Sequence, residues 1–520
     1  MIINDKTLIQ ELCSNDLCEP ITDLIERTKK QFEGFEHPLD DSIVGANGKL
    51  KELLVGDEMT IVYTKAQKLD ELWRELLNKS IICLRYFDQR EPFLDNPDKS
   101  IVAYGIDALE EYHKRYIDFE SLLYGGSSYY RDHVFHVIRV WMLGVFCMLK
   151  TFKNDERFIS KLSFDGGAQS PGEINYLEYI SMWTIASLCH DLGYPLEKAE
   201  QILEKTRKMM REFIPNPNIW NNFSYSGTQD NINEYILKFI STKMKEAKVK
   251  PEDSEGQTND LEGQTANVKF YVGRIQPKYY LKYAKSLEGF QHGIISTVII
   301  YKMLLFFLES DFNLNDDHLY RTEDARQFYI RREILRAIAS HTCPDAYNIH
   351  ITTFSSLLFL CDEMQEWGRK TWNELYTGLH ENSVSLFIEA FSSEEIAIRE
   401  EIDMKSAEST DIVIQNILRV FDRQYSLYKT TFRDGQDTAK RDFDLKKTIV
   451  ITMPTPGADE LKISVEYGLP RTGASYFMVD LSKAAKGSAK RKEKELEKYK
   501  KDIMDRLSKK LYCKDLHFTN

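Results

Sequence analysis

Residues 187–196 read SLCHDLGYPL, and this stretch decides how the rest of the sequence is interpreted. His190 and Asp191 stand side by side at the end of an apolar run, directly before Gly193 and Pro195. Gly and Pro at these positions predict that one helix ends here and that another begins. Both polar side chains are therefore expected where the C-terminus of a helix opens into a pocket. Because a buried imidazole or carboxylate is costly unless it is paired or bound to a metal, other residues of these types are expected nearby.

Four further His and Asp residues stand in similar apolar surroundings. They are His136 within 131–150, His292 at the start of HGIISTVII, His341 at the end of LRAIASH, and Asp362 after the Leu- and Phe-rich run SSLLFLC. Taken singly, each has an ordinary explanation as a cap, a core histidine or a carboxylate paired with arginine. Taken together, they are the ligand types through which several helices can converge on a divalent metal.

Length, composition and charge limit the class of protein. A chain of 520 residues with 42% hydrophobic and 12% aromatic residues can build two or three domains with sizeable cores. The net charge of −12 argues against a general nucleic-acid binder. The most apolar run, GIISTVIIYKMLLFFL, contains Lys302 and is short for a membrane span. Eight cysteines without CxxC pairs and an N-terminus unlike a signal peptide predict a cytoplasmic location without a membrane.

The pattern along the chain predicts a mainly α protein with three parts. These are a helical N-terminal region (1–120), a helical body (121–375) with a mobile polar insertion (244–268), and an α+β C-terminal domain (380–520). Within the body, helices are expected at 131–150, 176–192, 290–310, 323–341 and 353–368.

The C-terminal domain is expected to contain strands and two helices. SVSLFIEAF and EIAIREEID alternate as strands do, and the SS between them predicts a hairpin. KTIVITM, LKISVEY and SYFMVDL predict three more strands, separated by Pro and Gly turns. A helix is expected near 409–428, and a highly charged helix ends the chain.

The order of the polar residues resembles the HD-domain metal-dependent phosphohydrolases over roughly residues 125–370. The residues that carry the resemblance are HVIRV at 136–140, LCHDLG at 188–193, and Asp362 after a Leu-rich run. The segments HGIISTVII and FLCDEMQEWG also resemble HD modules of bacterial conflict systems. The resemblance implies a helical HD-domain body in which His136, His190, Asp191 and Asp362 bind a metal.

Members with two more histidines between the HD pair and the last Asp hold a second metal, and His292 and His341 occupy that place. The resemblance thus implies two transition-metal ions (Mn, Fe, Ni or Zn, with Mg as an alternative), a bridging and catalytic Asp191, and phosphohydrolase activity. Tyr194 stands where dNTP triphosphohydrolases usually have His. A single metal, with His292 and His341 contacting substrate instead, therefore stays open.

A phosphate substrate also needs positive charge and hydrogen-bond donors beside the metal. The residues expected to contact substrate are His133, Arg131, Tyr194, Arg332 and Arg336. Helical spacing places Arg332 and Arg336 on one side of their helix, so one of them is expected to approach the site. A small nucleotide is favoured over nucleic acid because the chain is acidic.

Two further functions are kept as alternatives, a catalytically inert HD scaffold and an HD nuclease. In the first of these, the C-terminal domain would bind a protein partner or a second copy of the chain.

Overall fold

The structure is a computed structural model of the whole chain. It describes residues 2–12, 62–88, 103–126, 131–152, 157–164, 171–214, 228–247, 269–310, 312–313, 318–343, 350–369, 382–404, 444–454, 460–471, 476–483, 501 and 505.

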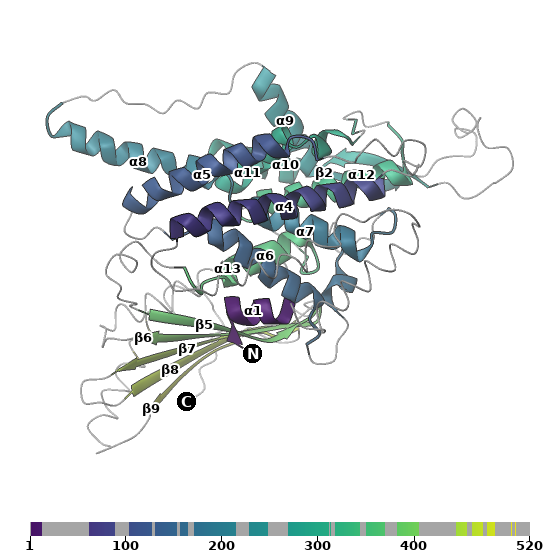
Figure 1. Cartoon of the computed structure of the whole chain (residues 1–520). Coiled ribbons are helices and arrows are strands. Elements are labelled where there is room, and N and C mark those ends of the chain that lie inside the picture. The colour runs from purple at the N-terminus through teal and green to yellow at the C-terminus, as the bar shows by residue number, and fades with distance from the viewer. Residues whose placement is uncertain are drawn as a thin grey trace, which may run out of the picture.

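Helices dominate these residues and form the body of the molecule (Figure 1). They are α1 (Asp5–Leu12), α4 (Val62–Asp88), α5 (Ile106–Gly126), α6 (Val134–Leu149), α7 (Tyr176–Cys189), α8 (Tyr194–Arg211), α9 (Thr228–Ser241), α10 (Pro277–Glu288), α11 (His292–Met303), α12 (Thr322–Ser340) and α13 (Phe354–Met364), with short 3-10 turns at Phe158–Lys161 and Leu305–Leu308. The predictions of a mainly α protein with a β part, and of helices at these places in the body, are confirmed. Among the described residues, no helix has both the length and the apolarity that a bilayer span requires.

The centre of the body is formed by α6 and α7, which are buried almost completely. Every side chain of α6 is buried, as its apolar sequence predicts. α7 begins with a capping box, in which Asn175 accepts from the backbone N–H of Glu178 and the Glu178 carboxylate accepts from that of Asn175. Trp183 of α7 donates to the backbone oxygen of Trp141 in α6 at 3.0 Å, which fixes the two helices against each other.

A mixed sheet of six strands, counted over the described residues, lies below the helices in Figure 1. Its order is β1 (Ile2–Ile3), β5 (Asn382–Phe391), β6 (Glu395–Met404), β7 (Asp444–Pro454), β8 (Glu460–Leu469) and β9 (Tyr476–Lys483). β6 and β7 run parallel, and the other neighbours run antiparallel. The predicted hairpin and the three later strands are confirmed. The helix expected near 409–428 lies outside the described residues, as does nearly all of the charged final helix.

A small sheet contains the first four residues of the insertion that is predicted to be mobile at 244–268. β2 (Thr242–Ala247) pairs with β3 (Phe270–Ile275), which pairs with β4 (Tyr320–Arg321). Residues 244–247 therefore belong to a strand, and 248–268 lie outside the described residues. The side chain of Met244 is buried in the core, so this apolar residue holds β2 on the body.

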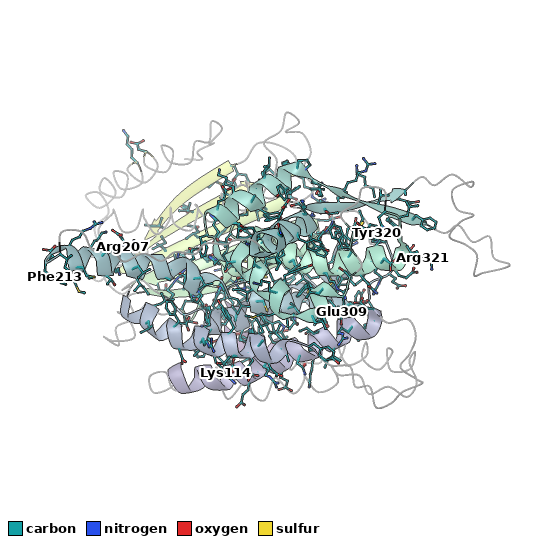
Figure 2. All side chains as sticks on the ribbon, turned by 90° about the horizontal axis from the view of Figure 1, so that it is seen from above. Lys114, Arg207, Phe213, Glu309, Tyr320 and Arg321 are labelled. Carbon is teal, nitrogen blue, oxygen red and sulfur yellow. The ribbon has the colours of Figure 1, made fainter. Side chains whose placement is uncertain are left out.

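The first residues of the chain join the sheet to the body. β1 pairs with β5, and α1 packs between the sheet and α6. Buried apolar side chains form one core that reaches from Ile3 to Tyr467, so the described part of 1–120 packs into the body. In the view from above, Arg207 and Phe213 lie at one end of the body, and Tyr320 and Arg321 lie at the opposite end (Figure 2).

Candidate metal centre

The helices bring all of the predicted metal ligands into one cluster. His136 lies in the first turn of α6, and His190 is the C-cap residue of α7 with Asp191 next to it. The other ligands come from α11, α12 and α13. His292 is the first residue of α11, His341 is the C-cap of α12, and Asp362 lies in the last turn of α13.

One half of the cluster, called the first subsite, contains His136, His190 and Asp362. The Oδ1 atom of Asp362 lies 2.8 Å from Nε2 of His136 and 3.7 Å from Nε2 of His190. One ligand atom from each of the three residues lies within 4.8 Å of the other two. Asp191 adds its Oδ2 atom, which lies 3.4 Å from Nε2 of His190 and 3.8 Å from Nε2 of His136.

The other half, called the second subsite, contains His292 and His341 and uses the other oxygen of Asp191. Oδ1 of Asp191 lies 3.2 Å from Nε2 of His292 and 3.6 Å from Nε2 of His341. These two imidazole nitrogens lie 3.2 Å from each other. Asp191 therefore presents one carboxylate oxygen to each subsite, as a ligand that bridges two ions does.

Each histidine of the cluster has an acceptor at its Nδ1 atom, which leaves Nε2 for the centre. The carbonyl oxygens of Ser187 and Ile338 accept from His190 and His341 at 2.7 and 2.6 Å. Gln365 and Glu197 provide the oxygens for the two remaining rings, at 2.6 Å from Nδ1 of His136 and 2.7 Å from Nδ1 of His292. These acceptors take the Nδ1 protons, so the Nε2 atoms face the carboxylates. When a ring is deprotonated at Nε2, that atom would offer its lone pair to a cation, as in metal-binding histidines.

A metal fits this donor set because a buried nitrogen otherwise has no partner. Nε2 of His190 has no hydrogen-bond partner within the protein. Because the residue is fully buried, water cannot serve as its partner either. With its imidazoles neutral, as metal binding requires, the cluster would carry the net negative charge of its two carboxylates, which a divalent cation offsets. Imidazole and carboxylate ligands together suit Mn, Fe, Ni and Zn.

The electrostatics of the metal-free cluster agree with this donor set. Burial raises the pKa of Asp191, but His190 and the hydrogen bonds from His292 and His341 outweigh burial and hold it well below its ordinary value. Asp362 behaves in the same way beside His136 and His190, which also hold its pKa well below the ordinary value. Both carboxylates are therefore ionised at neutral pH.

His292 lies between two carboxylates and carries a proton in the metal-free cluster. Burial lowers its pKa, but hydrogen bonds to Asp191 and Glu197 raise it to about 9. The same contact to His292 offsets burial at Glu197 and lowers the pKa of that carboxyl to about 2. A cation between Asp191 and His292 would take the place of this proton, because metal ligands bind in their deprotonated forms.

The cluster has a closed and an open side. The side chains of His190 and His341 are 0% and 1% exposed and form its inner wall. Asp362 and His292 are 23% and 16% exposed, so solvent reaches the cluster at these two side chains.

Close packing against α11 explains why position 193, the last of the sequence HDLG, is glycine. A Cβ atom there would lie 2.5 Å from the backbone oxygen of His292 and 2.8 Å from Cβ of Ile295. The turn that carries Asp191 therefore approaches α11 more closely than any side chain allows. Ser296 locks the approach, because its hydroxyl accepts from the Gly193 N–H and donates to the His190 carbonyl oxygen.

The expected His133 and Tyr194 lie beside the cluster, and the charge of the expected Arg131 acts on Tyr194. The rings of His133 and Tyr194 stack at 3.8 Å between centroids, and Tyr194 lies edge-on to His292 at 5.2 Å. Burial holds the pKa of His133 well below its ordinary value, so this imidazole is neutral. Arg131 forms an ion pair with Glu366 and is partly exposed.

Arg369, which no sequence pattern singles out, also lies here. Its Nη2 atom donates to the carbonyl oxygen of Asp132 at 3.3 Å and lies 3.4 Å from Nε2 of His133. Its Nε atom is buried without a hydrogen-bond partner. The positive charge of Arg369 acts on the first subsite, where it contributes to lowering the pKa of His136 after burial.

The structure corrects the expectation that Arg332 or Arg336 contacts substrate. Both guanidinium groups bind the end of α9 and the start of β2, where Arg332 donates to the Thr242 carbonyl oxygen at 2.9 Å and Arg336 donates to that of Ile240 at 2.9 Å. Arg332 also pairs with Glu333. A helix that ends inside the core leaves carbonyl groups without partners, and these arginines satisfy them.

Comparisons of the chain with protein-family models, curated proteins and solved structures found no match. The assignment of a function therefore depends on the geometry of the centre and on the order of its ligands in the sequence.

Proposed function

We propose that the chain is a metal-dependent phosphohydrolase of the HD type, with two divalent ions bound at the cluster. The observation that carries the proposal is the position of Asp191, whose two oxygens face separate sets of histidine nitrogens. A carboxylate that only neutralised one imidazole would not need a second set of Nε2 atoms on its other oxygen. The order of these ligands along the chain, which resembles that of the two-metal HD enzymes, supports the same function.

Divalent ions bound here would lower the pKa of a coordinated water and neutralise phosphoryl oxygens, which is the chemistry that phosphate hydrolysis requires. Asp191 and Asp362 supply the negative charge that holds the ions. His136, His190, His292 and His341 supply neutral nitrogen ligands, each oriented through its Nδ1 hydrogen bond. The buried inner wall excludes bulk water from the side of His190 and His341.

Residues on the open side of the centre are proposed to bind the substrate. Arg369 and Arg131 offer guanidinium groups, which pair with phosphate oxygens through two donors at once. Tyr194 offers a hydroxyl, and burial raises its pKa so that the phenol stays protonated and can donate. We propose a nucleotide, in preference to a nucleic acid, as the substrate class, because the chain carries a net charge of −12.

A phosphate-release screen tests the proposed function. The purified protein, loaded with Mn²⁺, would be incubated with nucleoside mono-, di- and triphosphates and with single-stranded DNA and RNA. We expect phosphate or pyrophosphate from one class of nucleotide, loss of the activity with a chelator, and recovery when Mn²⁺ is restored. Cleavage of the strands alone would identify a nuclease. Tight metal binding without turnover on any substrate would identify an inert scaffold.

Replacing Arg369 by Ala is expected to raise the KM for the nucleotide by ~10-fold or more and to leave the metal content unchanged. A hydrogen bond from a charged donor contributes roughly 1.5–3 kcal/mol, and this arginine is proposed to contact phosphate rather than metal. Steady-state kinetics with metal analysis of the same samples measures both quantities. Arg399→Ala is the matched control, because Arg399 pairs with Glu389 on the six-stranded sheet. An unchanged KM in Arg369→Ala would remove this residue from the substrate site.

A further inference from the structure

A buried side chain, that of Gln365, is the hydrogen-bond partner of His136 at Nδ1. Oε1 of Gln365 lies 2.6 Å from Nδ1 of His136, and Gln365 is fully buried. Its amide nitrogen donates to the carbonyl oxygen of Trp367 at 2.6 Å. Since only the NH₂ end of the amide can donate to a carbonyl oxygen, this second bond fixes the orientation of the amide. Oε1 is therefore held toward His136, where it accepts the ring proton and directs Nε2 into the first subsite.

Asp5, far away in sequence, secures the segment that holds Gln365. Nε1 of Trp367 donates to Oδ1 of Asp5 at 2.7 Å. Arg139, which lies on α6 three residues after His136, donates to the Asp5 carboxylate through Nε and Nη2, each at 3.0 Å. Arg139 also donates to the carbonyl oxygen of Gly368 at 3.2 Å. The Asp5 carboxylate thus connects the helix that carries His136 to the segment that follows α13.

The N-terminal segment (residues 2–12) is itself anchored on two sides. On the body, Leu8, Ile9 and Leu12 of α1 are buried, and Glu11 pairs with Lys150 at 2.8 Å. On the sheet, β1 pairs with residues 386–387 of β5. Figure 1 shows α1 between the six-stranded sheet and the helices above it.

We propose that Gln365 is a positioning residue for His136, and that the N-terminal segment, through Asp5, Trp367 and Arg139, holds Gln365 in place. The occupancy of the first subsite and the docking of the N-terminal segment are then coupled, and each stabilises the other. This inference assumes that the cluster binds metal, as the proposed function requires. It adds that the start of the chain tunes the affinity of one subsite and not of the other.

Gln365→Met is expected to weaken binding at the first subsite by ~10–100-fold, the usual effect of losing the partner of a metal-binding histidine. Methionine keeps the length of the side chain but offers no strong acceptor for Nδ1 of His136. Binding at the second subsite is expected to stay within about threefold, because His292 and His341 have other Nδ1 partners. Asp5→Asn is expected to change the first affinity in the same direction by ~5–10-fold, at the low end of the usual range of coupling between sites. Mn²⁺ titration of the full-length chain, analysed as two sites, measures these affinities.

Glu11→Gln is the matched control, because it removes the ion pair between α1 and Lys150 and keeps Asp5, Trp367 and Arg139. Hydrogen exchange of residues 2–12 supplies a readout apart from affinity and activity. We expect Mn²⁺ to slow this exchange in the wild type and in Glu11→Gln, but not in Gln365→Met. Melting of each metal-free variant checks that it is folded.

The outcomes separate this inference from the proposed function. Equal Mn²⁺ affinities in the wild type and Gln365→Met would overturn the positioning role and leave the proposed function standing. Weakening of both subsites alike would also overturn it, since His136 is the histidine of the cluster to which the Gln365 side chain is hydrogen-bonded. A wild type that binds two ions and shows the expected effects, but hydrolyses no phosphate substrate, would support the inference while contradicting the proposed function. A wild type that binds no ion would overturn both.

Discussion

Replacing Asp191 by Asn is expected to lower phosphate-release activity by at least ~1000-fold, which corresponds to about 4 kcal/mol in the activation barrier. The same change is expected to reduce the bound metal from two ions per chain to one or none. Asparagine keeps the size of the side chain but removes the charge that both subsites share, and its amide nitrogen cannot coordinate a cation. One of the subsites would face an NH₂ group in place of an oxygen.

Metal analysis of the purified variant, together with steady-state kinetics, measures this result. Asp403→Asn is the control, because Asp403 is an exposed carboxylate on β6 of the sheet. If Asp191→Asn retained two ions and more than a tenth of the activity, Asp191 would not be the bridging ligand.

The second large effect is expected when the two subsites are disrupted separately. His136→Gln should remove the ion at the first subsite, and His341→Gln should remove the ion at the second. Each variant should retain one ion and lose turnover by ~100-fold or more, since both ions are needed to clamp the attacking and leaving oxygens. Asp191 faces each histidine with a different oxygen, so neither change removes the ligands of the other subsite.

Metal titration of both variants beside the wild type measures this result. The alternative of a single metal, with His292 and His341 contacting substrate, predicts a different one. In that case the wild type would bind one ion at saturation, His341→Gln would still bind one, and the KM would rise.

The sequence was sufficient to choose the candidate ligands because each stands out against apolar surroundings. His190, His292 and His341 mark helix ends in which almost every other residue is apolar, and such residues need a partner once they are buried. The cluster in the structure contains all of the residues chosen in this way. Their distribution between two subsites depends on distances between helices, which periodicity does not encode.

The side chains that hydrogen-bond the candidate ligands at Nδ1 were harder to recognise from the sequence. Glu197 looks like any acid in the first turn of a helix, and Gln365 differs from a surface glutamine only by its place three residues after Asp362. That spacing puts both side chains on one face of a helix, which was the signal available. The prediction that Arg332 or Arg336 contacts substrate had the opposite weakness. Their positive charge suggested a phosphate site, but the fold uses both side chains to satisfy backbone carbonyl groups.

In the β part, the strands could be predicted from local sequence patterns, but their pairing could not. Alternating residues predicted the strands from 383 onward, because a strand with one buried face has a period of two. β1 has only two residues and no pattern of its own, and its pairing with β5 depends on contacts across more than 380 positions. The parallel pairing of β6 with β7 is also a long-range choice, made by the packing of the sheet and not by either strand alone.

Anomalous X-ray diffraction from crystals of the Mn²⁺-loaded protein would locate the bound ions and show whether the centre is dinuclear. We expect two peaks in the anomalous map. One should lie against His136, His190, Asp191 and Asp362, and the other against Asp191, His292 and His341. A single peak at saturating Mn²⁺, or peaks that leave the Asp191 carboxylate without an ion on one of its oxygens, would contradict a dinuclear centre bridged by Asp191.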